Sequence, residues 1–409
     1  MSDDPSSRPA VSVLIACWGS EATIERAIRS ALELRSVDME VVVVDDGSTD
    51  RTAQIVQHLA SVDPRVRLTV LERNVGASEA RNRGLELVRG DWLTILDADD
   101  FFAPGGMEAL ARVAVGTPAR AVIGQQYWTD GRNRWISEWY DNADIRQPGR
   151  KRLADHPGLL YFVSPHAKLL HRSTWTGLRF EGRTMGDQAW IIGALLRAGD
   201  RIAVIRDEVY VWVRPAPDTK VSSITTRSRS SATAAVQTAA LAQRAYAAVA
   251  TAASEIEEPQ RSRFLAAYIE RLIRYDLGPH VALAVDRRDP ALSDIIDSVT
   301  RFIQAMPADL LAATNSGARD ALVPLVLRWH RLDRAARVAA GRLVAAIRAA
   351  SPSGRLEARD LRVRVALQPL ERLPAWIGGT LSQIALAIAV GPSYLARRLR
   401  RRPLAVARA

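Results

Sequence analysis

The sequence of 409 residues predicts an α/β fold, with a mostly parallel sheet in the N-terminal half and a largely α-helical C-terminal region. Three observations support this prediction. Short runs rich in β-branched residues alternate with segments of helical periodicity. Two of these runs end abruptly in acidic residues. After residue 226, Ala-rich segments with helical spacing and prolines between them replace the strands.

The elements of the N-terminal half follow from the pattern of apolar residues. The expected strands are 11–17, 39–44, 67–71 and 92–96, followed by 121–124 and 201–213. The helices between the first four strands begin near Thr23, Thr52 and Ala77. Because strands that alternate with helices form right-handed βαβ units, these strands should lie parallel. Residues 101–106 are expected to form a turn, and 141–156 a mobile polar loop.

Acidic residues follow two of the expected strands directly. Three carboxylates come after the last strand of the first group, at Asp97, Asp99 and Asp100, and Asp45 and Asp46 come after the second strand. Parallel strands end at one edge of a sheet, which is where open α/β sheets bind ligands. Crowded carboxylates repel one another unless a cation neutralises them, and Mg²⁺ and Mn²⁺ prefer oxygen ligands. We therefore expect the two clusters to share one site; the alternative is a set of polar turns.

Composition excludes several other kinds of site. The single cysteine, Cys17, can form neither an internal disulfide nor a multi-cysteine zinc site. The first strand is not followed by Gly-x-Gly-x-x-Gly, and no Gly-Lys-Ser/Thr loop occurs, so neither a dinucleotide-binding Rossmann site nor a P-loop is expected. The polar N-terminus does not resemble a signal peptide, which predicts a cytoplasmic protein.

The formal net charge of +11 is concentrated at the C-terminus, where residues 397–409 hold six arginines and no acid. The preceding stretch, 373–396, has no charged residue. Together they predict a peripheral protein whose tail contacts an anionic membrane surface at the inner face of the cell membrane. A spanning helix and ordinary packing remain alternatives. Nucleic-acid binding is not expected, because no aromatic residues interleave with the arginines.

Four motifs give the chain a specific resemblance. They are Val-Ser-Val-Leu-Ile from Val11, Val-Val-Val-Val-Asp-Asp-Gly-Ser-Thr-Asp from Val41, Asn-Val-Gly-Ala-Ser-Glu-Ala-Arg-Asn-Arg-Gly from Asn74, and Leu-Asp-Ala-Asp-Asp from Leu96. Residues 9–225 resemble the bacterial family 2 glycosyltransferases, which have the GT-A fold. The resemblance implies a nucleotide half at 9–100 and an acceptor half at 101–225. A helical domain at 226–350, with helices at 228–253, 263–275, 291–305 and 318–350, and a C-terminal segment at 351–409 lie outside it.

The resemblance also implies a role for each matching residue of the nucleotide half. Asp46 would face a uracil ring, Arg81 would lie near the base or the phosphates, and Asp97 would approach the ribose. Asp99, helped by Asp100, would coordinate Mg²⁺ or Mn²⁺ on the diphosphate. The remaining nucleotide-sugar-binding candidates are Ala16, Trp18, Ala98, Arg214 and Ser223. One departure is visible, since the family's Pro-x-Tyr-Asn at the end of the first strand is replaced by Ala-Cys-Trp-Gly. For Arg81, a surface salt bridge is the alternative.

Asp187 is the candidate catalytic residue. The family usually has Glu-Asp at this point, whereas this chain has Gly186-Asp187, and Asp187 aligns with the general base. Inverting sugar transfer needs one carboxylate to take the proton of the acceptor hydroxyl, while a cation carries the charge of the leaving diphosphate. The alternative role for Asp187 is a helix N-cap.

Aromatic residues between Tyr127 and Tyr140 leave two interpretations open. Trp128, Trp135 and Trp139 could line an acceptor pocket, because sugar rings pack their C–H faces on aromatic rings. They could also stabilise a β-hairpin around Asp130-Gly131, which we favour slightly. His166 is expected to be a structural residue.

These observations predict an inverting, metal-dependent hexosyl or N-acetylhexosaminyl transferase. It would move a sugar from a UDP-sugar to a hydroxyl of a cell-envelope glycan or a lipid-linked acceptor. A homo-oligomer is compatible with the sequence. The alternative is a catalytically inactive nucleotide-sugar-binding or scaffold protein on the same fold, which the departures at Gly186 and at the end of the first strand would explain.

Overall fold

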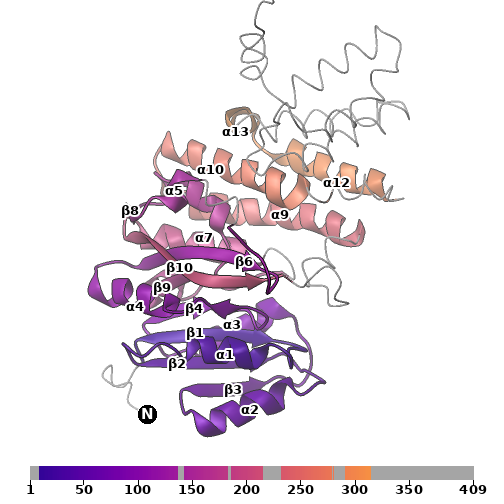
Figure 1. Cartoon of the computed structure of the whole chain (residues 1–409). Helices are drawn as coiled ribbons and strands as arrows, with labels where there is room; N and C mark the ends of the chain where they lie inside the picture. Colours follow the sequence, from indigo (N-terminus) through magenta and orange to yellow (C-terminus); the bar gives the residue numbers. More distant parts are fainter. Residues whose placement is uncertain are drawn as a thin grey trace, which may run out of the picture. The chain divides into compact units, whose positions relative to one another are not determined.

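The computed structural model describes residues 9–136, 142–182, 186–214, 232–278, 280 and 291–314. The chain divides into two compact units, Met1–Ser223 with Arg244–Phe264, and Ile224–Gln243 with Leu265–Ala409. The sheet lies in the first unit (Figure 1). The domain boundaries expected at residues 225 and 350 stay predictions.

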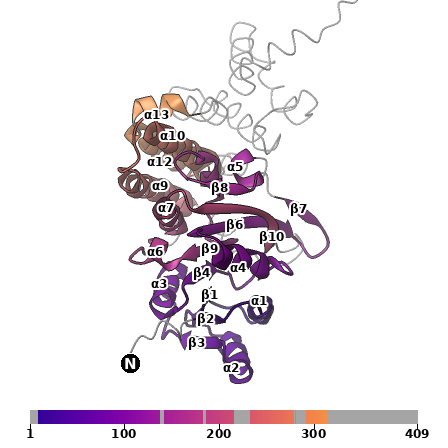
Figure 2. The same cartoon turned by 90° about the vertical axis from the view of Figure 1, so that its left-hand side faces the viewer.

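Four parallel strands form the N-terminal part of the sheet, in the order β3-β2-β1-β4. They are β1 (Val11–Cys17), β2 (Met39–Asp45), β3 (Val66–Val70) and β4 (Trp92–Ile95). The helices between them are α1 (Ile24–Ala31), α2 (Thr52–Val62) and α3 (Ala77–Leu87). Figure 2 shows α1 and α2 on one side of the sheet and α3 on the other. Because helices cover both faces, every residue of β2 is buried.

The sheet continues from β4 through β9 (Lys168–His171), β6 (Ala121–Thr129), β10 (Ile202–Val213) and β5 (Phe101–Phe102). β9 is antiparallel to both β4 and β6, and β6 is parallel to β10. The strands β4, β6 and β10 therefore run in the same direction and end at the same edge of the sheet. The predicted α/β fold with a mostly parallel sheet is confirmed.

Shorter elements complete the N-terminal half of the chain. β7 (Arg134–Ile136) forms a hairpin with β6, and β8 (Gly149–Lys151) pairs with β10. The helices are α4 (Gly106–Gly116), α5 (Ala143–Arg146), α6 (Arg172–Trp175) and α7 (Gly186–Ala198), with a 3-10 helix at Pro157–Phe162. The hairpin interpretation of the aromatic segment is thus confirmed for the described residues; Trp139 lies outside them.

One expectation for this half is confirmed only in part, and another is wrong. The turn expected at residues 101–106 is present at 104–105, but it is preceded by β5, which pairs with Tyr210 and Val211 of β10. The loop expected at 141–156 contains α5 and β8. Asn142 caps α5 by accepting a hydrogen bond from the Asp144 amide, and the Gln125 side chain donates to the carbonyl of Ile145. Contacts with residues distant in the sequence thus order segments that look polar and irregular by themselves.

A buried acid, Glu40, lies near the start of β2, at the sheet edge opposite the strand ends that carry the aspartates. One carboxylate oxygen accepts hydrogen bonds from the Ser12 hydroxyl (2.7 Å) and the Arg89 amide (2.6 Å). The other accepts from the guanidinium groups of Arg67 (2.7 Å) and Arg89 (3.1 Å). Burial opposes ionisation of Glu40, but these donors outweigh it and lower its pKa.

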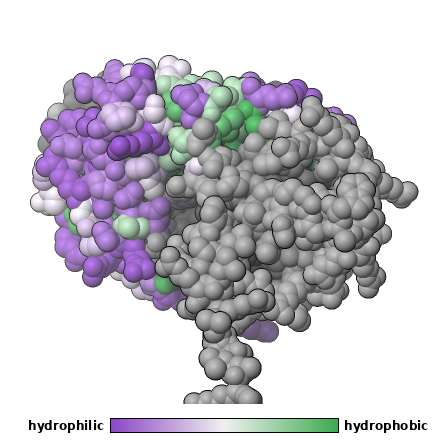
Figure 3. Space-filling model, turned by 90° about the horizontal axis from the view of Figure 1, so that it is seen from above, coloured by the Kyte–Doolittle hydropathy of each residue, from purple (hydrophilic) through white to green (hydrophobic). Residues whose placement is uncertain are grey.

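The described helices of the C-terminal half are α9 (Ala232–Ala252), α10 (Gln260–Arg271), α12 (Leu292–Ala305) and α13 (Ala308–Ala313), with a π-helical segment at Leu272–Leu277. In α12 the buried residues recur at helical spacing, at Ile295, Ile296, Val299, Phe302 and Ile303. In the view from above, the coloured surface is largely hydrophilic, with a smaller hydrophobic area (Figure 3).

None of the helices in the described part of the chain has the length and apolar content needed to cross a bilayer. The helix expected at 318–350, the uncharged stretch 373–396 and the arginine tail lie outside the described residues.

Candidate active site

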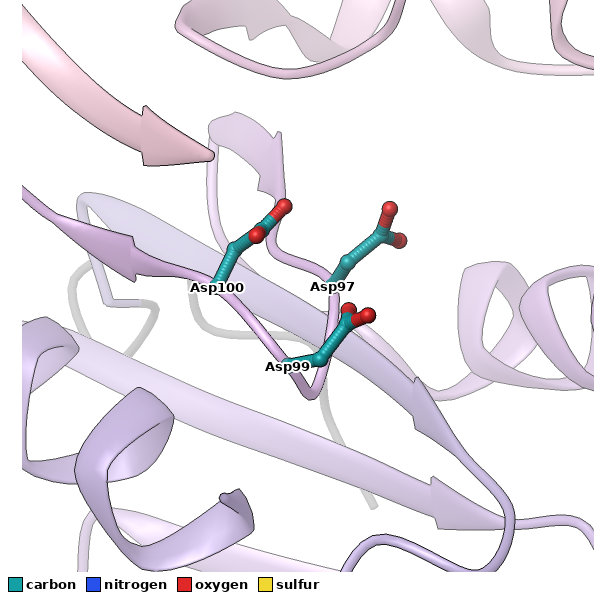
Figure 4. Close-up of side chains that lie close together, drawn as sticks. All are labelled: Asp97, Asp99 and Asp100. Atoms are coloured by element: carbon teal, nitrogen blue, oxygen red, sulfur yellow. The ribbon is translucent and has the colours of Figure 1, made fainter. Parts of the chain in front are cut away.

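Three carboxylates gather in the loop that joins β4 to β5. Asp97, Asp99 and Asp100 each offer an oxygen, and these oxygens lie within 4.8 Å of one another. Figure 4 shows the three side chains rising from the same short loop. The loop comes directly after buried β4, so the strand fixes where the acids emerge.

Asp97 is held from two directions. Arg81, from α3, donates a hydrogen bond to one oxygen of Asp97 (2.8 Å), and Nε2 of His166 lies 3.1 Å from the other. Burial opposes ionisation of Asp97, but the charges of His166 and Arg81 hold its pKa well below the usual value. Asp97 is therefore a fixed, ionised carboxylate. Arg81 does form a salt bridge, with Asp97, but the alternative of a surface salt bridge is wrong because only 15% of the Arg81 side chain is exposed.

Asp100 is anchored to β10. Its oxygens accept hydrogen bonds from the Tyr210 hydroxyl and the Val213 amide, both at 2.8 Å. The same Tyr210 oxygen accepts a hydrogen bond from the Asp97 amide (3.2 Å). Burial and the charges of Asp99 and Asp97 raise the pKa of Asp100 well above its usual value. Tyr210 thus fixes the backbone at one end of the acidic loop and a side chain at the other.

Asp99 has the accessible carboxylate of the group. Its residue is exposed, and no other described residue donates a hydrogen bond to its side chain. Arg26 donates to its main-chain carbonyl instead (2.7 Å). Although the residue is exposed, partial loss of solvent around its carboxylate, together with the charge of Asp97, raises the pKa of Asp99. An all-oxygen donor set with unrelieved negative charge suits a hard divalent cation, with Asp99 as its most available ligand.

The acids after β2 are bonded differently. The carboxylate of Asp46 accepts hydrogen bonds from the amides of Val75 (2.7 Å) and Gly76 (2.8 Å), and Asp45 accepts from the amide and hydroxyl of Ser48. Asp46 therefore braces the turn before α3. Both clusters lie at the same sheet edge, on either side of β1, as expected. Within the described residues, however, the acids after β4 are the only group of three or more His, Cys, Asp or Glu side chains close enough together to hold one ion.

The other nucleotide-side candidates differ in exposure. Trp18, just beyond β1, is 49% exposed, whereas Ala16 is half-buried and Ala98 is buried. Arg214, just beyond β10, lies with its guanidinium carbon 4.6 Å from the ring centre of Trp128 and 5.7 Å from that of Trp135. Ser223 lies outside the described residues.

Asp187 lies in the first turn of α7 and is half-buried. Its charge acts on two buried cations: with Asp97, it raises the pKa of Arg81 against the opposing effect of burial, and it also acts on Lys168. The preceding residue, Gly186, lies where there is no room for a side chain. A Cβ there would lie 2.4 Å from the Glu181 carbonyl oxygen and 2.6 Å from the Ser78 hydroxyl oxygen.

Three residues of this site were not assigned to it from the sequence: His166, Lys168 and Tyr210. Lys168 is fully buried and donates hydrogen bonds to the carbonyls of Ser164 (2.7 Å) and His166 (3.2 Å). Burial lowers its pKa well below the usual value. These bonds secure the loop in which Ala167 takes a left-handed φ of 57°, and which carries His166 to Asp97. The sequence feature that could have indicated His166 and Lys168 is the presence of Ser164, His166 and Lys168 next to apolar residues.

Residues 12–175 match the model of glycosyl transferase family 2. This segment belongs to that family. Succinoglycan biosynthesis protein ExoO of Rhizobium meliloti is 43% identical over 115 residues, which are 28% of this chain and 32% of that protein. Glycosyltransferase GlyG of Streptococcus pneumoniae serotype 4 is 26% identical over 217 residues, 50% of this chain and 70% of GlyG. The match to ExoO thus spans about a third of that protein's length.

A similar fold occurs in the crystal structure of S. aureus TarS 1-349 in complex with UDP-GlcNAc. The TM-score is 0.62 at 21% sequence identity, covering 82% of this chain and 90% of that one. At this level of identity the likeness concerns the fold.

Proposed function

We propose that this protein is an inverting, metal-dependent glycosyltransferase that moves a sugar from a UDP-sugar to a hydroxyl of a cell-envelope glycan or lipid-linked acceptor. The observation that carries the proposal is the acidic loop after β4, where a fixed Asp97 lies beside an accessible Asp99. Family membership of residues 12–175 supports the reaction class. The relative named for succinoglycan biosynthesis supports the acceptor class.

In the proposed donor complex, different residues bind the uracil, the ribose and the diphosphate of the nucleotide. Asp46, with the turn that it braces, borders the uracil, and exposed Trp18 offers a ring for stacking. Asp97, held by Arg81 and His166, is preorganised to accept hydrogen bonds from the ribose. Asp99, with Asp100 beside it, would hold Mg²⁺ or Mn²⁺, which would neutralise the charge of the leaving diphosphate.

Asp187 is the general base of the proposed reaction. It would take the proton of the acceptor hydroxyl as the oxygen attacks the anomeric carbon from the side opposite the leaving group. The charges of Asp97 and Asp187 both raise the pKa of buried Arg81, so the donor-binding carboxylate and the base act on the same cation. No protein acid is needed at the leaving diphosphate if a cation carries its charge.

One of the two sequence departures that favoured a catalytically inactive protein, Gly186, now has a structural explanation. Glycine at position 186 is required by close packing against Ser78 and Glu181, so its presence has a local reason that does not depend on loss of catalysis. The acidic residue beside it, Asp187, is retained.

The test is release of UDP from a panel of UDP-sugars with Mn²⁺ or Mg²⁺, with and without chelator. General-base catalysis contributes about 10²–10⁴-fold, so Asp187→Asn should reduce turnover by about that factor while leaving UDP binding intact. Turnover of no donor, together with normal UDP binding, would favour the inactive alternative. An active Asp187→Asn variant would remove Asp187 from its role.

A further inference from the structure

Tryptophans occupy the sheet edge beside the acidic loop, where the acceptor-half strands end. Trp128 of β6 pairs across the ladders with Trp135 of β7 on one side and with Trp212 of β10 on the other. Side chains at paired positions of neighbouring strands point to the same face. The three rings, which we call the tryptophan platform, therefore lie side by side, and each is half-buried.

The platform is continuous with the acidic loop. Alternate residues of β10 share one face, so Tyr210 and Trp212 follow one another along it, and Arg214 comes directly after the strand ends. Tyr210 holds Asp100, and His166 stacks on Tyr210 with ring centres 5.0 Å apart. His166 also meets Trp212 edge-on at 6.0 Å, and Trp212 lies 4.0 Å from Trp128. An unbroken row of rings thus leads from the Asp97 partner His166 to the hairpin.

A positive charge lies over the outer end of the platform. The Arg214 guanidinium stacks on Trp128 and Trp135, which leaves its N–H edges available. No carboxylate of the described residues forms an ion pair with it. Arg134, on the opposite face of the same hairpin, stacks on Tyr127 in the same way but is neutralised by Glu208. Within the described residues, the platform face therefore has a cation without an ion pair, whereas the arginine on the opposite face is paired.

We propose that the tryptophan platform and Arg214 bind the acceptor, and that this acceptor is an acidic glycan. Aromatic faces pack against the C–H faces of sugar rings, and a guanidinium recognises a carboxylate in two-point geometry. In this assignment Arg214 serves the acceptor and not the donor diphosphate. The inference rests on the proposed function, because it treats the acidic loop as the place where the donor is held.

The experiment is an array of size-matched pairs of neutral and uronate-containing oligosaccharides, probed with the full chain in the presence of UDP and Mn²⁺. We expect at least tenfold stronger retention on uronate-containing members than on their neutral partners. Trp135→Leu should abolish retention on both kinds, and Trp135→Phe should restore part of it. Arg214→Gln should remove the preference for acidic members.

Arg134→Gln is the matched control, since it removes the same kind of stacked arginine from the opposite face of the hairpin. It should change retention less than twofold. Thermal unfolding of each variant shows whether the hairpin still folds. Retention that is absent, equal for neutral and acidic members, or unaffected by both Trp135→Leu and Arg214→Gln would overturn the inference.

Calorimetric titration of the same preparations with UDP and Mn²⁺ separates this inference from the proposed function. If wild type does not bind UDP, the proposed function fails whatever the array shows. If UDP binds and the array stays blank, only the acceptor inference fails. A tenfold loss of UDP affinity in Arg214→Gln, with glycan retention unchanged, would return Arg214 to the diphosphate and overturn its assignment here.

Discussion

Acids at the two ends of the parallel strands are in opposite electrostatic states. At one edge, both oxygens of Glu40 are bonded to arginine, serine and amide donors, and its pKa is lowered. At the other, one arginine and one histidine are both paired with Asp97, and the pKa values of Asp99 and Asp100 are raised. The first arrangement stabilises the fold. The second stores unrelieved negative charge, which a bound cation can relieve.

Among the variants that test this comparison, the largest effect is expected for Asp99→Asn. If Asp99 is the most available cation ligand, the variant should lose about 100- to 1,000-fold in transfer rate. It should not lose stability, because no other described residue donates a hydrogen bond to its side chain and the surroundings that raise its pKa disfavour the charged form. Initial rates with Mn²⁺ and a thermal unfolding scan measure the two properties. A midpoint that falls by several degrees would show that Asp99 supports the fold, against the comparison.

Glu40→Gln should give the reverse pattern, with a loss of about 2 kcal/mol in the free energy of unfolding at pH 7 and unchanged activity per folded molecule. Because the folded-state pKa of Glu40 is lowered, its ionised form contributes stability above the unfolded pKa of about 4.3. That contribution is lost as the pH falls through the folded pKa. Urea unfolding at pH 7 and at pH 3–4 should therefore show the difference between variant and wild type shrinking. A difference that is constant with pH would contradict this account of Glu40.

Gly186→Ala tests the close packing at the start of α7, next to the candidate base Asp187. Its Cβ would meet the Glu181 carbonyl and the Ser78 hydroxyl, so we expect about 1–2 kcal/mol of destabilisation and a lower transfer rate as the start of α7 shifts with Asp187. Gly116→Ala is the matched control, because a Cβ at this helical glycine meets nothing within 4 Å. Urea unfolding and initial rates of both variants check the prediction. Equal behaviour of the two alanine variants would show that the contact is relieved at no cost.

The smallest effect is expected for Arg29→Ala, which removes an exposed ion pair with Glu25 on α1. Both side chains are more than half exposed, so water screens the pair and its loss should cost no more than about 0.5 kcal/mol. Activity should not change. A loss as large as that of Glu40→Gln in the same urea titration would mean that burial does not set the value of these charges, and the comparison between the edges would fail.

The strand ends that carry the aspartates could be predicted from the sequence because the pattern that indicates them is local. Apolar runs interrupted by Asp97 and by Asp46 place acids at strand ends, and alternation with helices makes those ends coincide. Four strands, three helices and the acidic loop follow from this pattern, and the structure has them.

The partners of these acids could not be predicted in the same way, because they come from distant segments. β9 enters the sheet antiparallel between β4 and β6 and brings His166 to Asp97, and Tyr210 reaches Asp100 across 110 residues. Nothing in the local pattern of either segment specifies that pairing. The tryptophan platform shows the same limit: the hairpin could be predicted, but the third ring, Trp212, joins it only through the parallel pairing of β6 with β10.

The most direct test of the central claim is calorimetric titration of the wild-type protein with UDP, first with Mn²⁺ and then with chelator, alongside Asp99→Asn. The acidic loop after β4 is held to be a nucleotide site completed by a cation. Wild type should therefore bind UDP at least tenfold more tightly with Mn²⁺ than without it, and Asp99→Asn should lose that difference. Equal UDP affinity with and without metal, or a metal effect that survives Asp99→Asn, would contradict the account.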